Sequence, residues 1–453
     1  MPIHKNQIIP LAIHGLSSDG NAVGRFEGKA IFVPGGAVGD MLQVTIVKNA
    51  KTHAFGRIHQ VVTPGPGRQK ADCPIAGVCG GCSFRHLTYK AELAAKQTFV
   101  EDALQRIGKL EVPVLEILPS PQQDRYRNKA QYPVAEENGA FVYGFYAGRS
   151  HRIVPCADCL LQPTLLNQIA ARTAGLLQQL GCTAYNEATR TGLIRHIYLR
   201  QGGHSGQVLL CLVATGQSLP QNEVFVDTMV AEFPAIKSIV LNHNPVHTNV
   251  ILGKHSKVLF GNGTIKDALC DVPLRLGVHS FSQVNTAGAE HLFATAQNFA
   301  ALTGGETLLD LYCGAGVIGL SMAARCKQLI GVEIVPEAVE NAKHSAAQMG
   351  LQNTRFLCED AGTAATRLAA EGTRPDVIVV DPPRKGCDEQ TLAAMVAMAP
   401  ARIVMVSCNP ATMARDLAIL TQSGYVVKQV QPVDMFPRTK HVECVVLMYR
   451  KGN

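Results

Sequence analysis

The stretch that decides the fold is residues 308–319, which read LLDLYCGAGVIG. An apolar run that can form a buried strand leads into a turn containing Gly314 and Gly316, and then into a helix. Glycine in such a turn lets the backbone approach a ligand at a point where a Cβ atom would clash. The turn alone is equally consistent with a dinucleotide site or with a tight strand–helix connection.

The chain around this turn alternates regularly between strand and helix patterns from about residue 276 onward. Regular alternation of this kind is typical of an α/β fold with a doubly wound sheet. The expected strands are Thr307–Tyr312, Gln328–Ile334, Arg355–Cys358, Asp376–Val380, Arg402–Ser407 and Val442–Tyr449.

Acidic residues stand at or near the ends of four of these strands. Glu333 follows Asp310 by 23 residues, where a carboxylate can accept hydrogen bonds from ribose hydroxyls. Asp360 follows the third strand and Asp381 the fourth. Any one of them could be a helix cap or a surface charge. Because ligands of open α/β sheets bind outside the carboxyl ends of the strands, all four together predict one crevice for an adenosine-containing cofactor.

Length and charge indicate several domains and a polyanionic partner. A chain of 453 residues exceeds what one core usually supports, so two or three domains are expected. Residues 1–130 contain 16 Lys and Arg against 10 Asp and Glu, whereas residues 131–453 contain 26 against 25. A basic N-terminal third is typical of proteins that bind nucleic acid, although a basic surface without a partner is the alternative.

Targeting signals are not found. The beginning, Met1 to Lys5, lacks an apolar signal region, and no run of about 18 apolar residues occurs. We therefore expect a cytoplasmic protein that does not enter the membrane. Its 14 cysteines should then be mostly thiols, metal ligands or catalytic groups instead of disulfides.

The N-terminal region predicts a small β-barrel. Residues 28–62 contain β-branched runs that are separated by breakers such as Pro34-Gly35-Gly36. Alternating Pro and Gly at 64–67 predict a linker, and helical spacing predicts a helix over 89–107. The expected domains are residues 1–63, 64–275 and 276–453.

Cysteines cluster after the barrel. Cys73, Cys79 and Cys82 lie within ten residues, and Cys156 and Cys159 compete as a distant fourth ligand. Three neighbouring thiols with one from elsewhere suit a four-iron, four-sulfur cluster or a tetrahedral zinc ion. The spacing leaves both open.

Four motifs together resemble one family. They are FSQVN at 281–285, DPPRKG at 381–386, SCNP at 407–410 and MFPRTKHVE at 435–443. On these motifs the sequence resembles the uracil-5 RNA methyltransferases, which modify 23S ribosomal RNA and transfer RNA. The resemblance covers most of the chain. It implies a Rossmann-like methyltransferase domain, a TRAM domain of OB-like fold at residues 1–63, and a mixed α+β central domain.

The resemblance also implies the residues of the active site. Carbon 5 of uracil is a poor nucleophile, so a thiolate must first add to carbon 6, and the resemblance gives this role to Cys408. A single cysteine without this context is more often a small buried apolar residue. Glu443 would remove the carbon-5 proton after methyl transfer, although a glutamate at a strand end is more often an exposed charge. The implied S-adenosylmethionine-binding residues are Gln283, Tyr312, Glu333 and Asp381.

The remaining implications concern the cluster and the RNA. Cluster-bearing members carry the same cysteine run, so the resemblance favours a 4Fe-4S cluster on Cys73, Cys79, Cys82 and Cys159. Members specific for transfer RNA usually lack both the cluster and the TRAM barrel, so we expect 23S rRNA as the substrate of a monomeric enzyme. The helix at 89–107 is expected to pack on the catalytic domain.

Two other classes of protein fit these residues less well. An amino methyltransferase would carry an aromatic residue where Arg384 stands, and it would need no cysteine. A non-catalytic iron–sulfur protein would not require Cys408 together with Glu443.

Overall fold

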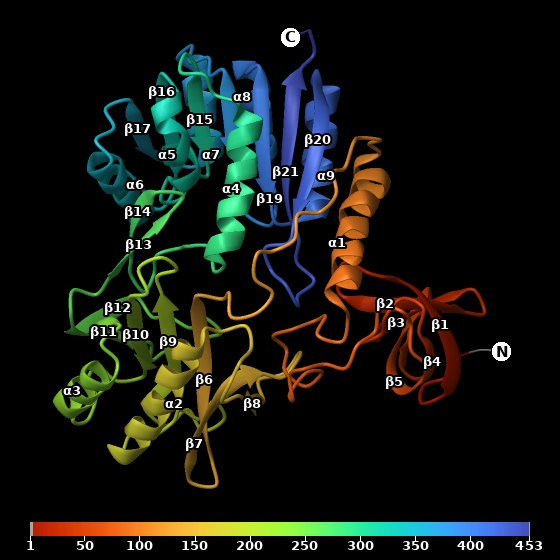
Figure 1. Cartoon of the computed structure of the whole chain (residues 1–453), viewed down its shortest axis with the longest axis vertical. Coiled ribbons are helices and arrows are strands. Elements are labelled where there is room, and N and C mark those ends of the chain that lie inside the picture. The colour runs from red at the N-terminus through yellow and green to blue at the C-terminus, as the bar shows by residue number, and fades with distance from the viewer. Residues whose placement is uncertain (1–2, 453) are drawn as a thin grey trace.

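The chain folds into three lobes, which are separate in the view of Figure 1. The structure is a computed structural model that describes residues 3–452. Met1, Pro2 and Asn453, at the ends of the first and last predicted domains, lie outside the described residues. Within residues 3–452, no helix has the length and hydropathy that crossing a membrane requires.

The first lobe is a closed five-stranded barrel with the strand order β1-β2-β3-β5-β4. Side chains alternate along β1, so that Ile9, Leu11 and Ile13 point into the core while their neighbours are exposed. The predicted barrel is confirmed, but β1 and β2 precede the run at 28–62 from which it was predicted. The strands are β1 (Ile8–Leu16), β2 (Asn21–Phe26), β3 (Lys29–Pro34), β4 (Met41–Asn49) and β5 (His53–Thr63).

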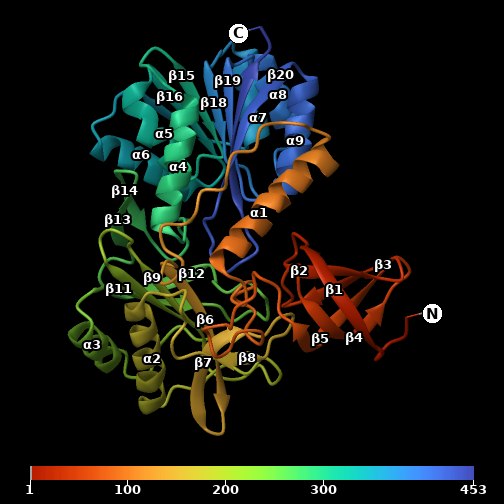
Figure 2. The ribbon, with the colours of Figure 1, turned by 45° about the vertical axis from the view of Figure 1, so that its right-hand side comes forward.

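Helix α1 (Tyr89–Ala103) leads from the barrel to the C-terminal lobe (Figure 2). It begins at Thr88, whose side chain accepts a hydrogen bond from the N–H of Ala91. It continues as a short π-helix, η1 (Leu104–Gly108). Val100 packs in the core beneath the C-terminal sheet. Phe99 packs with Phe84 and Leu87, which follow the cysteine-rich segment at residues 73–82, called the cysteine segment below. The helix therefore contacts the catalytic lobe, as expected, and also the region before it.

The central lobe is a seven-stranded sheet with the order β12-β11-β10-β9-β6-β7-β8. Its helices α2 and α3 cover one face. Tyr198, Leu209 and Cys211 on the other face belong to the same core as the helix that opens the C-terminal lobe, α4. The elements are β6 (Lys129–Glu137), β7 (Ala140–Tyr146), β8 (Ile153–Pro155), α2 (Thr164–Gln179), β9 (Ile194–Gln201), β10 (Val208–Ala214), α3 (Asn222–Glu232), β11 (Ile236–His243) and β12 (His255–Phe260).

The C-terminal lobe contains the predicted Rossmann-like sheet, in the order β17-β16-β15-β18-β19-β21-β20. All its strands run parallel except β21, which is antiparallel to both neighbours. The strands are β15 (Thr307–Leu311), β16 (Gln328–Glu333), β17 (Thr354–Cys358), β18 (Val377–Val380), β19 (Arg402–Ser407), β20 (Tyr425–Val433) and β21 (Glu443–Arg450). Six of them lie within one residue of the expected bounds, and β20 was not predicted.

Helices cover both faces of this sheet. Helices α4, α5 and α6 pack on one face, and α1, α7, α8 and α9 pack on the other. The added elements are the hairpin β13 (Ile265–Leu269) and β14 (Val272–Leu276), then α4 (Thr286–Ala300), α5 (Val317–Met322), the 3-10 turn η2 (Ala323–Arg325), α6 (Pro336–Gln348), α7 (Ala361–Ala370), α8 (Glu389–Met398) and α9 (Pro410–Gln422). The carboxyl ends of β15, β16, β18 and β19 therefore meet at one edge.

Candidate active site and cysteine cavity

The predicted nucleophile and base leave neighbouring strands at the same edge of the sheet. Cys408 directly follows β19, and Glu443 is the first residue of β21. The two strands are antiparallel, with Ser407 opposite Cys444. The next residue beyond this pair on one strand is Cys408, and on the other it is Glu443. Strand pairing thus brings both side chains to the mouth of the crevice beyond β18.

The two groups share an electrostatic environment with the loop after β18. Burial, and to a lesser extent the charges of Glu443 and Asp381, raise the pKa of the Cys408 thiol to about 11, against the opposing charge of Arg384. Burial also raises the pKa of Glu443 well above its ordinary value, helped by Asp381 and opposed by Arg384. Glu443 is 5% exposed. A carboxylate with a raised pKa is a stronger base once it is ionised.

The glycine-rich turn is shaped for a ligand. Gly314 has a left-handed φ of 56° and donates its N–H to Glu333 Oε2 over 3.0 Å. A Cβ atom on Gly319 would lie 2.7 Å from Asp310 Oδ2, so only glycine allows this helix to approach the strand. Tyr312 has a φ of 61°, and its hydroxyl lies 3.1 Å from the Thr391 hydroxyl. A left-handed backbone at a non-glycine residue is a feature that clusters at functional sites.

The carboxylates at the strand ends differ in their hydrogen-bond partners and in their pKa values. Glu333 Oε1 also accepts from the N–H of Val335 at 2.9 Å. Asp310 Oδ2 accepts from Gly319, but its buried Oδ1 has no hydrogen-bond partner among the described residues. Burial raises the pKa of Asp310 to about 8 and that of Asp381 to about 7. Asp360 instead caps α7 through the N–H of Thr363, so the helix-cap alternative holds for that residue.

Gln283, the remaining residue expected to bind the cofactor, comes from a different part of the chain. It lies in the segment between β14 and α4, and its backbone carbonyl accepts from Asn128 Nδ2 at 3.1 Å. Asn128 also donates its N–H to the carbonyl of Val284. The central lobe therefore fixes the path of the FSQVN segment beside the catalytic lobe.

Sequence reasoning assigned no role to Arg384. It stands in the loop after β18, and its charge opposes the raised pKa of both Cys408 and Glu443. The only sequence signal was its place in the DPPR motif.

The predicted metal-ligating cysteines meet in a cavity of about 290 Å³ between the cysteine segment and the central lobe. Arg85, Arg127 and Lys129 also line it. Cys156 lines the cavity as well, so the structure does not choose between the two candidates for the fourth ligand. The cysteines that line it are Cys73, Cys79, Cys82, Cys156 and Cys159.

The spacing of these thiols bears on which metal group they could hold. Among residues 3–452, no three Cys, His, Asp or Glu side chains are close enough together to hold one metal ion. Zinc–sulfur bonds of about 2.3 Å would require such close packing, whereas a cluster of iron and sulfide places its thiolates around a larger body. Thiol donors around a cavity of this size fit a cluster chemically, and the iron–sulfur assignment stays a prediction.

Aromatic side chains of the barrel divide into two groups. Phe26 packs against the barrel core. Phe32 and Phe55 lie outside this core and are partly exposed, with ring centroids 5.7 Å apart. His53 stands edge-on to Phe55 at 5.2 Å. Rings in this position can stack on the bases of a single strand.

Known proteins match all three lobes. The family model for tRNA (uracil-5-)-methyltransferases matches residues 240–451, and the TRAM domain model matches residues 4–59. An RNA methyltransferase of Halalkalibacterium halodurans is 42% identical over 100% of this chain and 99% of its own. One from Listeria monocytogenes is 41% identical over 99% of this chain and 98% of its own.

A solved structure shows the same architecture. The tRNA (uracil-54, C5)-methyltransferase of Pyrococcus abyssi, in complex with S-adenosyl-L-homocysteine, has a TM-score of 0.78 and 25% identity to this chain. The match covers 97% of this chain and 100% of that one. The chain therefore belongs to the family of S-adenosylmethionine-dependent RNA (uracil-5) methyltransferases that carry a TRAM domain.

Proposed function

We propose that this enzyme methylates carbon 5 of a specific uridine in 23S rRNA through a covalent bond to Cys408, with Glu443 as the base. The observation that carries the proposal is the pairing of β19 with β21, which brings a thiol and a buried carboxyl to the edge where the cofactor crevice opens. A reaction at carbon 5 of uracil needs both groups beside one ring.

The proposed reaction begins at carbon 6. The Cys408 thiolate forms a bond to carbon 6, and the electrons of the 5,6 double bond move to carbon 5 and oxygen 4 as an enolate. S-adenosylmethionine supplies an electrophilic methyl group when it is bound. Carbon 5 forms a bond to this methyl carbon, and the methyl–sulfur bond breaks. Gln283, Tyr312, Glu333 and Asp381 would bind and orient the cofactor for this step.

Elimination completes the reaction. Glu443 takes the proton from carbon 5, the electrons of that C–H bond restore the 5,6 double bond, and the carbon–sulfur bond to Cys408 breaks. The thiolate leaves and 5-methyluridine is released. Arg384, whose charge lowers the pKa of both groups, favours their ionised forms.

We propose further that Cys73, Cys79, Cys82 and Cys159 hold a 4Fe-4S cluster. Their shared cavity and the family's cysteine run support this assignment. Protein purified without oxygen should be brown and contain about four irons per chain. Stoichiometric zinc without iron would contradict the cluster.

Transfer RNA is the second candidate substrate. The Pyrococcus abyssi enzyme, which resembles this chain over nearly its whole length, is named as a tRNA methyltransferase. The preference for 23S rRNA rests on the cysteine run, since the match to the Pyrococcus abyssi enzyme covers 97% of this chain and so includes most of the barrel. We also propose that residues 1–63, 64–275 and 276–453 act as three domains of a monomer working in the cytoplasm, where such RNA is found.

The substrate can be identified directly. Unmodified transcripts of 23S rRNA and transfer RNA would be incubated with the enzyme and S-adenosylmethionine, and the methylated position mapped by mass spectrometry. We expect 5-methyluridine in the 23S transcript. Methylation of the transfer RNA alone would establish the alternative.

A further inference from the structure

Residues 434–442, which we call the base loop, join β20 to β21 and end directly before Glu443. Asp434 and Met435 are fully buried, and Arg438 is 7% exposed. Because Glu443 is the first residue after this loop, the path of the loop determines how its carboxyl enters the crevice.

Four successive carbonyls of the base loop accept hydrogen bonds from other parts of the chain. Each bond leads to a different segment. Bonds within the loop add to them, because Phe436 O also accepts from the N–H and the hydroxyl of Thr439, and the N–H of Phe436 donates to Asp434 Oδ1. The bonds are Met435 O from Asn285 Nδ2 at 2.9 Å, Phe436 O from Lys96 Nζ at 3.1 Å, Pro437 O from the Tyr126 hydroxyl at 2.9 Å, and Arg438 O from the N–H groups of Ser83 and Phe84 at 2.8 and 3.1 Å.

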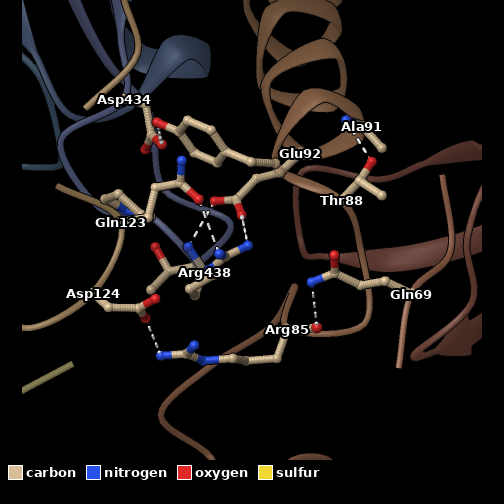
Figure 3. Close-up of polar contacts among 12 residues, drawn as sticks. Gln69, Arg85, Thr88, Ala91, Glu92, Gln123, Asp124, Asp434 and Arg438 are labelled. Atoms are coloured by element: carbon tan, nitrogen blue, oxygen red, sulfur yellow. Dashed lines mark hydrogen bonds and ion pairs between the residues drawn. The ribbon is translucent and has the colours of Figure 1, made fainter. Parts of the chain in front are cut away.

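A buried ionic group on α1 provides the strongest of these contacts. Lys96 Nζ lies 2.7 Å from Glu92 Oε1 and 2.7 Å from Asp434 Oδ1, and all three side chains are fully buried. Glu92 Oε1 accepts the N–H of Arg438 at 2.7 Å, and the Tyr89 hydroxyl donates to Asp434 Oδ2 at 2.8 Å. Figure 3 shows Glu92 pointing from α1 toward Arg438, with Asp434 beside them.

The positive and negative charges of this group are equal in number. Lys96 and Arg438 provide two positive charges, and Glu92 and Asp434 provide two negative ones; Arg438 Nη1 lies 4.0 Å from Glu92 Oε2. A buried charge without a partner is strongly destabilising, so the four side chains hold one another in place. None of them is Cys408, Glu443 or one of the residues expected to bind the cofactor.

We propose that Lys96 and Glu92 are positioning residues for Glu443, because they fix the base loop that precedes it. The inference rests on the proposed function of Glu443. It gives α1 a role in the second half of the reaction only, which is removal of the carbon-5 proton and release of Cys408. Proton removal requires the carboxylate within hydrogen-bond reach of carbon 5, whereas thiolate addition depends on Cys408 at the end of β19.

The test separates the two halves of the reaction. In Lys96→Met, the apolar side chain replaces most of the lysine stem but loses the hydrogen bonds to Glu92, Asp434 and Phe436. Single-turnover experiments with the unmodified transcript that the enzyme methylates would follow methyl transfer to RNA and, separately, the fraction of methylated RNA that is free of enzyme after a denaturing quench. We expect release to slow about tenfold or more, since small misplacements of a catalytic group have effects of this size, while methyl transfer changes by about twofold or less. The methylated covalent complex should then accumulate.

Matched variants keep the test decisive. Lys90→Met makes the same change at an exposed position of α1 and should leave both steps as in the wild type. Glu92→Gln keeps an oxygen acceptor for the N–H of Arg438 and should retain most of the release rate. If Lys96→Met does not fold, Tyr126→Phe, which removes only the hydroxyl bonded to Pro437, should slow release about threefold with unchanged methyl transfer.

Two results would overturn the inference. Equal slowing of methyl transfer and release in Lys96→Met would show a general structural role. Unchanged release in Tyr126→Phe would show that the anchors of the base loop do not position Glu443. Failure of the proposed function is distinguishable, because Glu443→Gln would then form no stalled methylated complex. If Glu443→Gln stalls but folded Lys96→Met releases RNA normally, only the positioning role is wrong.

Discussion

The crevice at the edge of the C-terminal sheet and the cysteine cavity are built in different ways. In the crevice, Cys408 and Glu443 are placed by strand pairing, so backbone hydrogen bonds of the sheet determine their separation. In the cavity, the thiols come from two loop segments, 73–82 and 156–159, and no regular strand carries them. The first arrangement follows from the sheet itself, whereas the second depends on how two loops approach each other, where the N–H of Gly80 donates to the carbonyl of Tyr146. Variants at the two sites should therefore fail differently.

Loss of the nucleophile should have the largest effect. Cys408→Ala should lower methylation roughly 10⁴-fold or more, because no other group can add to carbon 6, while the sheet and cofactor binding remain. Cys358→Ala, an exposed thiol at the end of β17, is the matched control and should be fully active. Methylation assays with radiolabelled cofactor measure both. Turnover by Cys408→Ala would end the covalent mechanism.

Loss of a cysteine at the cavity should instead affect assembly. Cys82→Ser or Cys159→Ala should remove most of the iron and lower the melting temperature, because a ligand that binds only the folded state stabilises it. Affinity for S-adenosylmethionine should change little, since the crevice does not depend on these loops. Iron analysis, calorimetry and melting curves test this. Iron lost in Cys156→Ala but kept in Cys159→Ala would identify Cys156 as the fourth ligand.

The barrel adds a third kind of site, which should act through affinity alone. Phe55→Ala should weaken RNA binding by about 1–3 kcal/mol without changing its salt dependence, because stacking involves no counterion release. Replacing both Lys48 and Arg57, exposed on β4 and β5, by alanine should reduce the salt slope by about 0.7 for each lost phosphate contact. Binding titrations at several salt concentrations distinguish them. An unchanged slope would place the phosphate contacts elsewhere.

The smallest expected effect concerns the pH dependence of cofactor binding. With a pKa of about 7, Asp381 is largely protonated at pH 6 and ionised at pH 8, and Asp310, with a pKa of about 8, ionises above it. S-adenosylmethionine bears a positive sulfonium, so its affinity should rise about three- to tenfold over this interval. S-adenosylhomocysteine, which has no sulfonium charge, should respond less. Calorimetry would contradict this account if Asp381→Asn kept the full pH dependence.

The sequence predicted the parts of the molecule that regular strands place better than the parts that loops place. The bounds of six strands in the C-terminal sheet were predicted within one residue, because buried β-branched runs between glycine and proline breakers are a local signal. Strand β20 was missed because Lys428, Gln429 and Gln431 interrupt its apolar pattern. Glu92 and Lys96 gave no signal, because charged residues four apart on a helix usually form an exposed pair. The fourth cysteine stayed open, since Cys156 and Cys159 lie in one loop and both line the cavity.

The most direct test of the central claim is the fate of RNA on Glu443→Gln. The amide cannot accept the carbon-5 proton at neutral pH, so the enzyme should methylate once and remain bonded to its substrate. Mass spectrometry of the denatured, nuclease-digested complex should find a methylated uridine attached to the peptide that contains Cys408. Full turnover by Glu443→Gln, or a methylated product with no bond to Cys408, would contradict the account.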